Sequence, residues 1–334
     1  MNKKTVLLFL SLIILISSVF LLILYINRSI FSSITSKFPG NFNSNQPTPF
    51  QPFIPSVTPT PEGYFIQSSL MPVSEIRSPL GQVNILLLGS DYRPESGYRT
   101  DVILLVSILT KEQKVRLISF PRDLFIEIPG YGKERINTTQ AKGGFSLTNA
   151  SFEYNFGIHL DHYLMTNLSG FQAIVDTLGG IEINASENLY DRCDLPYAHG
   201  GYCSVGPGAY HLDGPLALWY VRSRSTTSDF DRLRRAQEVL EGLFHKLITW
   251  DAISRAPDLY DLFINSVETD LSLNDISALL PLASKIALEP DRVERYSIDE
   301  SMVSPTTNLN TGGSVLSPDY NAIWQVIQQA IYTP

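Results

Sequence analysis

The stretch VNILLLG at residues 83–89 constrains the fold most strongly, because it is a continuous apolar run typical of a central strand covered on both faces. Two further apolar runs follow at residues 102–109 and 114–120. Only residues 110–113 separate them, so they are expected to form a hairpin or neighbouring strands. The globular part of the chain should therefore begin with a sheet.

A strand, a helix and a second strand are predicted next, at residues 162–167, 170–180 and 181–185. Gly179 and Gly180 are expected to end the helix. Strands with interspersed helices predict a layered α/β domain.

Three more helices are predicted towards the end of the chain. Residues 231–248 carry apolar side chains at helical spacing, so one face of that helix should pack on the core. Ser272 with Asp275 has the pattern of a capping box, and Ser317 followed by Pro318 is a conventional helix entry.

Residues 5–26 contain no charge and exceed the roughly 18 to 20 apolar residues that a helix needs to cross a bilayer. A cleavable signal peptide has an apolar core of only about 7 to 15 residues, so a retained membrane anchor is expected. Lys3 and Lys4 precede the span, whereas Arg28 and Lys37 follow it, which favours a cytoplasmic N-terminus only weakly. The bulk of the chain would then lie outside the cytoplasmic membrane.

A proline-rich segment over residues 38–81 cannot build a core and is expected to act as an extended spacer. The sequence thus predicts four parts. They are a short cytoplasmic end with the anchor (1–27), a proline-rich linker (28–81), the main domain (82–250) and a helical extension packed on the same domain (251–334).

Cys193 and Cys203 are the only cysteines, and they bound a stretch with the glycine, proline and tyrosine content of a loop. We interpret them as a disulfide that staples a surface loop in an oxidising compartment. Zinc binding with His199 and Asp194 is the alternative, although structural zinc sites generally use Cys and His at tighter spacing.

The net charge of −8 disfavours a duplex nucleic-acid binder, which should carry a broad basic face. Charge is instead gathered locally. Asp91 and Asp101 border the segment between the first two apolar runs, with Arg93 and Arg99 beside them. Two carboxylates facing one point suit a hard divalent cation, and the arginines could grip an anion. The alternative is a structural ion-pair cluster at a strand end.

The stretch YVRSRSTTSDFDRLRRAQ, residues 220–237, is the densest basic feature. Arginine forms bidentate pairs with phosphate oxygens. Alternation along a strand would place Arg222 and Arg224 on one face, and Arg232 with Arg235 would form a second pair near a helix N-terminus. Arg234 points elsewhere and could pair with Glu238. A solvated basic surface is the alternative interpretation.

Arg122 and Asp123 end the third apolar run in a similar position, so the sum of these features predicts a phosphate or pyrophosphate site beside a Mg²⁺ site. The chain has no P-loop, kinase signature or GxSxG elbow, and its five histidines follow no metalloprotease spacing. Nucleotide hydrolysis and serine-hydrolase chemistry therefore have no support.

The consecutive motifs LLLGSDYR…YRTDVILLV, ISFPRD, KERINTTQAKGG, LGGIEI, GAYHLDGPLALWYVRSR and DFDRLRRAQ resemble the LytR–CpsA–Psr family of bacterial cell-wall enzymes over about residues 82–245. The resemblance implies an α/β/α sandwich with a mixed central sheet and a hydrophobic groove for a lipid tail. It also implies a phosphotransferase that moves a glycopolymer, such as a teichoic acid, from a polyprenyl pyrophosphate carrier to a peptidoglycan muramic acid hydroxyl, with Mg²⁺ or Mn²⁺ as cofactor.

Carried over by motif, the metal-associated and catalytic carboxylates are Asp91 and Asp101. The arginines and the glutamine that would grip the pyrophosphate are Arg99, Arg122, Arg222, Arg224, Arg232, Arg235 and Gln237. The chain departs from the family pattern at Asp231 and Ala236, where Gly and Gln are common, and the extra carboxylate could weaken anion binding or hold an arginine in place. The alternatives are a non-catalytic scaffold that binds lipid pyrophosphates and a pyrophosphatase that hydrolyses the carrier.

Overall fold

The computed structural model describes residues 78–93, 97–224, 227–247, 261, 263, 265–308 and 311–333. All of them belong to one compact unit, Pro47–Pro334. The anchor expected at residues 5–26 and nearly all of the expected linker lie outside these residues. Within the described part of the chain, no helix is long and apolar enough to cross a membrane.

A six-stranded mixed sheet forms the centre, in the order β11-β6-β1-β2-β3-β12. The strands are β1 (Gln82–Arg93), β2 (Gly97–Leu109), β3 (Lys114–Ser119), β6 (His162–Asn167), β11 (Val267–Thr269) and β12 (Val293–Ser297). β2 is antiparallel to both β1 and β3, while β1 pairs in parallel with β6 and β3 with β12. The carboxyl ends of four strands and the amino end of β2 therefore meet at one edge of the sheet.

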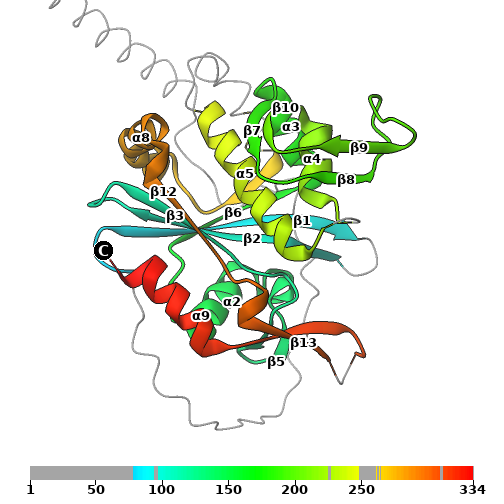
Figure 1. Ribbon diagram of the computed structural model, residues 1–334. Helices are drawn as coiled ribbons and strands as arrows, with labels where there is room; N and C mark the ends of the chain where they lie inside the picture. Colours follow the sequence, from blue (N-terminus) through cyan, green and yellow to red (C-terminus); the bar gives the residue numbers. More distant parts are fainter. Residues whose placement is uncertain are drawn as a thin grey trace, which may run out of the picture. The chain divides into compact units, whose positions relative to one another are not determined.

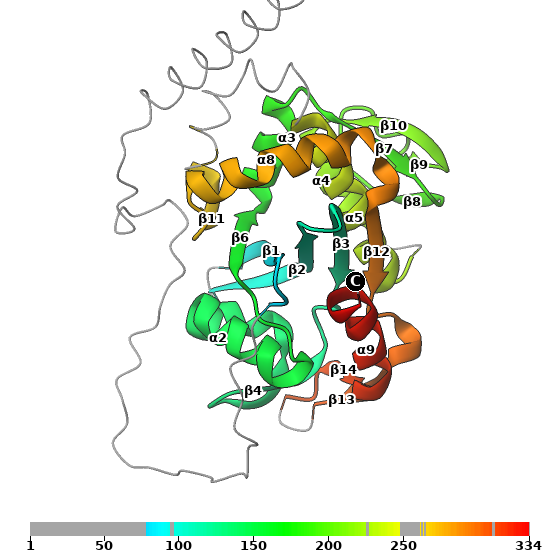
Figure 2. The same ribbon diagram turned by 90° about the vertical axis from the view of Figure 1, so that its left-hand side faces the viewer.

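Helices cover both faces of the sheet (Figures 1 and 2). One face carries α2 (Thr139–Phe156) and α9 (Tyr320–Ile327), and the other carries α3 (Leu168–Thr177), α4 (Gly214–Arg222), α5 (Asp229–Leu247) and α8 (Leu273–Leu288). The fold is thus a mixed α/β fold with helices on either side of the sheet, as predicted.

Among the described residues, four two-stranded ribbons flank these layers. They are β4 (Phe125–Ile128) with β5 (Gly132–Arg135), β7 (Ile181–Ala185) with β10 (Gly208–Leu212), β8 (Leu189–Arg192) with β9 (Tyr202–Val205), and β13 (Val303–Thr307) with β14 (Ser314–Pro318). The short helical turns are η1 (Ile136–Thr138), η2 (Pro290–Arg292), η3 (Glu300–Met302) and η4 (Gln328–Tyr332).

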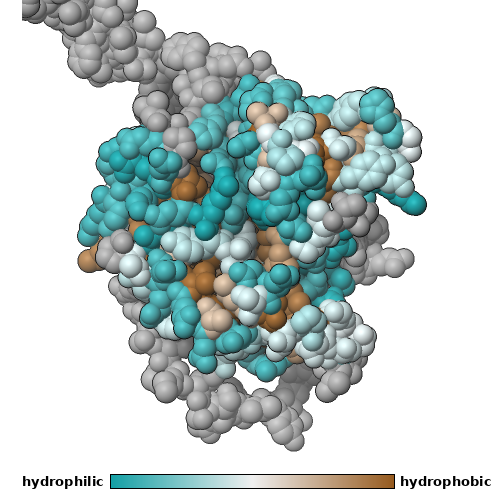
Figure 3. All heavy atoms as spheres, in the orientation of Figure 1, coloured by the Kyte–Doolittle hydropathy of each residue, from teal (hydrophilic) through white to brown (hydrophobic). Residues whose placement is uncertain are grey.

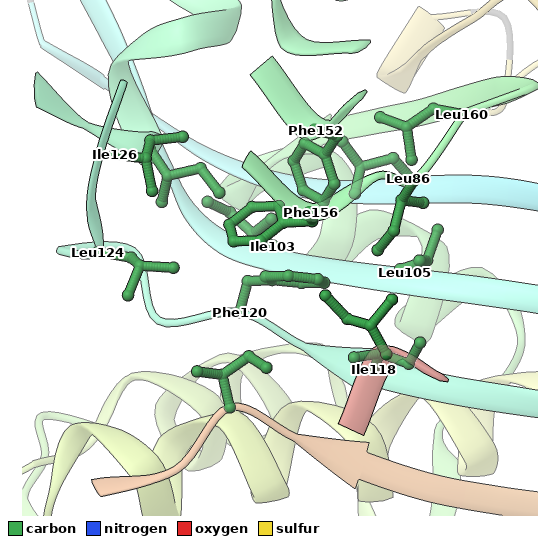
Figure 4. Packing of buried hydrophobic residues seen from close by; sticks show 14 of the residues in the cluster. Leu86, Ile103, Leu105, Ile118, Phe120, Leu124, Ile126, Phe152, Phe156 and Leu160 are labelled. Carbon is green, nitrogen blue, oxygen red and sulfur yellow. The ribbon is translucent and has the colours of Figure 1, made fainter. Parts of the chain in front are cut away.

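The main core lies between the sheet and α2, where the rings of Phe120, Phe152 and Phe156 pack with centroids 5.0 to 5.5 Å apart (Figure 4). A second cluster joins α3, α4 and α5 to the ribbon β7–β10, with Tyr220 buried at its centre. The face of the molecule shown in Figure 3 is mostly polar, and apolar groups show there only as separate patches. Burial of these two clusters fixes the helices that carry the site.

Several predicted elements are confirmed. Strands form at the three apolar runs and at residues 162–167, and α3 ends before Gly179 and Gly180, both of which adopt positive φ. The capping box of Ser272 and Asp275 begins α8. The helix over residues 231–248 corresponds to α5.

The predicted strand through Trp219 and Arg222 is wrong, because these residues form α4. Asp213 caps that helix by accepting a hydrogen bond from the Leu216 amide, and a proline follows in the first turn. The capping carboxylate and Pro215 outweigh the alternation of polar and apolar residues. Arg222 and Arg224 therefore do not share a strand face.

Two predictions for the C-terminal region also need correction. Ser317 and Pro318 belong to β14, and α9 begins two residues later than predicted, behind the cap Asp319. Residues beyond 250 are more than a helical extension, because they supply β11 and β12 to the central sheet. The short apolar runs of these edge strands gave little sequence signal.

Candidate functional site

A cavity of about 390 Å³ lies at the edge of the sheet where β2 begins and β3 ends. Its lining comes from five separate parts of the chain. The residues are Arg99, Asp101, Arg122, Asp123, Arg135, Asn137, Asp229, Phe230, Ser314, Val315 and Leu316. Eight of these eleven side chains are polar or charged, so the cavity suits a small charged ligand.

Asp101 sits in a β-bulge. Gly89 of β1 pairs with Val102 and Ser90 pairs with Thr100, which leaves Asp101 without a partner across the strand. Bulges of this kind redirect a side chain and are common beside functional sites. The Asp101 carboxylate accepts a hydrogen bond from Nη1 of Arg122 at 2.7 Å.

Arg122 follows β3 and is held by two carboxylates. Its Nε also lies 3.3 Å from Oδ2 of Asp123. Burial by itself lowers the pKa of Arg122, but the attraction of Asp101 and Asp123 outweighs burial and raises it. The guanidinium is therefore permanently charged and fixed in the cavity wall.

Arg135, at the end of β5, contributes a second fixed guanidinium. Its Nε lies 3.1 Å from Oδ1 of Asp123, and its Nη2 donates to the carbonyl of Ser314 at 2.7 Å. The Asp123 carboxylate thus lies between the guanidinium groups of Arg122 and Arg135 and keeps them apart. This pairing connects the ribbon β4–β5 to β14 across the cavity.

The N-terminus of α5 forms another wall, since its first two residues, Asp229 and Phe230, line the cavity. Arg224 donates from Nη1 to Oδ1 of Asp229 at 2.9 Å. Burial alone would raise the pKa of Asp229, but this hydrogen bond and the charges of Arg232 and Arg224 lower it. Free amides at a helix start also favour an anion.

Arg232 lies one turn further along α5 and is buried, with only 6% of its surface exposed. Burial lowers its pKa, while the charges of Asp229 and Arg122 act on it in opposite directions. Its Nε is buried without a hydrogen-bond partner. A buried guanidinium with an unused donor next to a cavity is a candidate binding group for an anion.

The lining itself holds three arginines and three aspartates, so it is close to neutral. Arg224 and Arg232, which interact with Asp229, shift the balance of the wider cluster towards positive charge. An incoming polyanion would compete with the aspartates for these guanidinium groups.

Asn137 adds an acceptor to the cavity wall. The residue is only 3% exposed, and its Oδ1 is buried without a hydrogen-bond partner. Its backbone carbonyl accepts a hydrogen bond from Thr100 of β2 at 3.3 Å, which fixes η1 against the sheet. Unsatisfied buried acceptors are uncommon in folded proteins and are candidates for ligand contacts.

The structure brings together five of the predicted residues. Asp101, Arg99 and Arg122 line the cavity, and Arg224 and Arg232 interact with its Asp229 wall. Asp91 on β1 lies opposite Arg99 on β2. Arg99 lines the cavity, whereas Asp91 does not. Arg222 ends α4, where it is exposed, and it does not belong to the lining.

Arg235 and Gln237 are both buried in α5 and do not line the cavity. Arg235 donates to the carbonyls of Tyr220 and Ser223 and to the hydroxyl of Thr227, and Gln237 donates to Ser119 Oγ and the Tyr296 carbonyl. These bonds hold α5 against α4 and the sheet. The polar groups of both side chains are thus engaged by the protein. Their contact with pyrophosphate remains a prediction.

The unusual Asp231 completes a capping box. Its Oδ2 accepts from the amide and hydroxyl of Ser228, and Ser228 Oγ accepts from the Asp231 amide at 3.1 Å. Its other oxygen lies 3.3 Å from Arg234. The extra carboxylate therefore stabilises the start of α5. Arg234 also pairs with Glu187 at 2.6 Å and, as predicted, lies within 3.9 Å of Glu238.

Cys193 and Cys203 form the predicted disulfide, which closes the loop between β8 and β9. No group of three or more His, Cys, Asp or Glu side chains in the described part of the chain is placed to hold a metal ion. The zinc alternative for these cysteines is therefore not supported.

Arg135, Asn137 and Asp229 are cavity residues that were noted in the sequence but given no role in the predicted site. All three stood in motifs that drew attention, KERINTTQ and SDFDRL, but a charged or amide side chain beside a helix start is ordinarily a capping or surface residue. Only the packing of η1 and α5 around the end of β3 shows that they share one cavity.

The carboxylates at the cavity could hold Mg²⁺ only with help from other ligands. Asp101 offers a carboxylate in the cavity, and Asp91 lies on the neighbouring strand opposite Arg99, two residues before Asp101. Two carboxylates without a third protein ligand do not make a preformed metal centre. They fit Mg²⁺ that keeps waters and shares phosphate oxygens with a bound substrate, which is the usual mode for this ion.

Comparison with known proteins places this geometry in context. The sequence model of the LytR_cpsA_psr family matches residues 67–329. The polyisoprenyl-teichoic acid–peptidoglycan teichoic acid transferase TagU of Oceanobacillus iheyensis is 32% identical over 206 residues, covering 59% of this chain and 62% of that protein. The regulatory protein MsrR of Staphylococcus aureus is 29% identical over 251 residues, covering 74% of each. The match thus spans about three fifths of the length of TagU.

Solved structures show the same fold. The crystal structure of B. subtilis TagV has a TM-score of 0.62 at 23% identity, covering 76% of this chain and 98% of that one. The structure of TagT bound to LIIa-WTA has a TM-score of 0.59 at 24% identity, covering 76% and 92%. Since the family model covers most of the chain, including every residue of the cavity, the chain belongs to the LytR_cpsA_psr family.

Proposed function

We propose that this protein transfers a glycopolymer phosphate from a polyprenyl pyrophosphate carrier to a peptidoglycan muramic acid hydroxyl, which forms a phosphodiester link in the cell envelope. The observation that carries the proposal is the convergence of Arg99, Arg122 and Arg135 on one cavity, with Arg224 and Arg232 behind its Asp229 wall. The name of the TagU relatives, teichoic acid transferase, supports the same class of reaction.

The arginines suit a pyrophosphate better than a single phosphate. Arg122 and Arg135 lie on either side of Asp123, so they offer positive charge at two places in the cavity, which suits two linked phosphate groups. Arg232, with an unused Nε, and the backbone amides at the start of α5 add positive potential at the Asp229 wall. Fixed donors of this kind stabilise the charge that builds up during phosphoryl transfer, at little cost in reorganisation.

In the proposed reaction the acceptor hydroxyl attacks the phosphorus that carries the glycan. A new phosphorus–oxygen bond forms to the muramic acid, and the bond to the polyprenyl phosphate breaks. Polyprenyl phosphate leaves with its negative charge, which Arg122 and Arg99 offset, and the hydroxyl proton passes to a base that we leave open. Asp101 is engaged by Arg122, so it is a weak candidate for that base.

Asp91 and Asp101 would hold Mg²⁺ or Mn²⁺, with the remaining positions left to water and substrate oxygens. When bound, the ion would neutralise part of the pyrophosphate charge. We further propose that the segment at residues 5–26 anchors the protein in the cytoplasmic membrane, with the catalytic domain outside it, where both the lipid carrier and peptidoglycan are found. The disulfide agrees with such an oxidising compartment.

The proposal is tested with the purified full chain in detergent, a polyprenyl-pyrophosphate-linked oligosaccharide and Mg²⁺, with and without peptidoglycan. Phosphodiester-linked glycan that depends on the acceptor is the expected product. Release of polyprenyl phosphate without any acceptor would indicate a pyrophosphatase instead. Tight binding of the carrier with no turnover, with or without peptidoglycan, would indicate a scaffold. Either of these two results would refute the proposed transferase.

A further inference from the structure

The hairpin formed by β8, β9 and the loop between them, residues 189–205, is closed by the Cys193–Cys203 disulfide. We call it the disulfide hairpin. It projects from the layer that contains α3 and α4 (Figure 1). One of its faces is buried, with Leu189, Asp191 and Val205 each below 9% exposure, whereas the other face carries the stacked rings of Tyr190 and Tyr202.

The disulfide hairpin touches α4 along the whole length of that helix. The hydroxyl of Tyr197 donates to the capping carboxylate of Asp213 at 3.0 Å. In the middle of the helix, Nε1 of Trp219 donates to the Arg192 carbonyl at 3.0 Å. Beyond the C-terminus, the amide of Arg224 donates to Oδ2 of Asp191 at 2.8 Å. The hairpin is therefore a brace beside α4 rather than a free loop.

Asp191 is the contact that reaches the site. Its other carboxylate oxygen accepts from the Arg192 amide at 2.7 Å, so the side chain is fixed within the hairpin. Across the strands Asp191 pairs with Cys203, one of the two disulfide cysteines. Arg224, whose amide it holds, donates from its guanidinium to Asp229 in the cavity wall.

The same segment is held from the opposite side by Arg235. That guanidinium is 2% exposed and binds the carbonyls of Tyr220 and Ser223 as well as Thr227. Directly after α4, the Ser223 carbonyl is thus fixed by Arg235 and the Arg224 amide is fixed by Asp191. A carboxylate and a guanidinium at these places determine where the Arg224 side chain begins.

We propose that Asp191, held in place by the disulfide hairpin, is a positioning residue that orients Arg224 towards the cavity. The proposal rests on the proposed function, because it assigns Arg224 to the binding of a pyrophosphate. It predicts that damage to the hairpin, which is not part of the cavity lining, weakens anion binding while leaving the core intact.

The test compares the full wild-type chain in detergent with Asp191→Ala and with the double variant Cys193→Ser/Cys203→Ser. Ser204→Ala, on the exposed face of the same hairpin, is the matched control. Two quantities are measured. The first is hydrogen exchange in a peptide covering residues 221–230, with a peptide from the core strand β3 as reference. The second is the dissociation constant for geranyl pyrophosphate in Mg²⁺.

Both hairpin variants are expected to exchange at least tenfold faster in the 221–230 peptide, with β3 unchanged, and to bind the probe about tenfold more weakly. The control should match the wild type. Faster exchange with unchanged affinity would overturn the positioning role, and so would unchanged exchange.

Two further outcomes are decided by design. If the wild type fails to bind geranyl pyrophosphate, the proposed function fails, and the exchange data alone judge whether Asp191 fixes the segment. If Asp191→Ala also speeds hydrogen exchange in the β3 peptide, the milder variant Asp191→Asn is used instead, because it keeps one acceptor oxygen. An intermediate loss of affinity is then expected, and wild-type affinity together with faster exchange at 221–230 would refute the proposal.

Discussion

Arg122 forms an ion pair with Asp101, the unpaired residue of the bulge in β2, with 2.7 Å between Nη1 and Oδ1. The side chains are 18% and 24% exposed, so both are largely shielded and yet reachable from the cavity. The pair ties the start of β2 to the loop after β3. The position of Arg122 is therefore set by the sheet itself, and a ligand finds it already oriented.

Replacing Arg122 by alanine should lower the affinity for geranyl pyrophosphate by about 10- to 100-fold, because a hydrogen bond between charged groups contributes roughly 1.5 to 3 kcal/mol. The affinity of Arg122→Lys should lie between those of the wild type and the alanine variant, because lysine keeps the positive charge but cannot form a bidentate pair. Calorimetry on the full chain measures the effect. Arg292→Ala, which removes a surface arginine paired with Glu289 at 2.6 Å, is the control, and an equal loss in both would count against the site.

Asp101→Asn tests the metal assignment by binding alone. In a chelator the variant should bind geranyl pyrophosphate at least as tightly as the wild type, because a carboxylate that competes for Arg122 has been removed. Addition of Mg²⁺ should tighten binding by the wild type several-fold and have little effect on the variant. Titrations with geranyl pyrophosphate, with and without Mg²⁺, measure the two affinities. An equal response to Mg²⁺ in both proteins would show that Asp101 is not a metal ligand.

The sheet and the long helices could be predicted, because each has a strong local signal. The apolar runs of β1, β2 and β3 and the capping box of α8 reflect burial and backbone hydrogen bonding within a few residues. The stretch before Arg222 was mistaken for a strand. Its alternating pattern was genuine, but the cap at Asp213 and the proline after it decided in favour of a helix.

The site was predicted in part for a related reason. Arg122 and Asp101 were found because a charge beside a buried strand is costly and unusual. Arg135 was not found, because its role depends on β14, which is 179 residues away in the sequence at the Ser314 contact. Arg235 lies in an arginine-rich stretch that is typical of anion binding. Only the tertiary contacts show that its guanidinium donates to backbone carbonyls instead.

Asp231→Ala should destabilise the protein without loss of binding. The reciprocal bonds with Ser228 satisfy amides at the start of α5, and removal of such a cap costs about 1 kcal/mol. The thermal unfolding temperature should fall, and the affinity for geranyl pyrophosphate should change less than threefold. A clear gain in affinity would show instead that this carboxylate opposes the anion.

Glu268→Gln should stabilise the protein at neutral pH. Glu268 lies on the edge strand β11, where Tyr163 donates to its Oε1 at 2.9 Å and its Oε2 is buried without a hydrogen-bond partner. Burial raises the pKa of this carboxyl, and the hydrogen bond from Tyr163 only partly opposes the rise. Folding therefore costs more when Glu268 is ionised than when it is protonated.

The sign of the pH dependence follows from the raised pKa. Below the unfolded value of about 4.3 the group is protonated in both states and the penalty is absent, whereas above the folded pKa the penalty is complete. Glu268→Gln should thus raise the free energy of unfolding by about 1 kcal/mol at pH 7 and by little at pH 4. Denaturant unfolding at the two pH values measures this, with the exposed Glu300→Gln as control. An equal gain at both pH values would exclude ionisation as the cause.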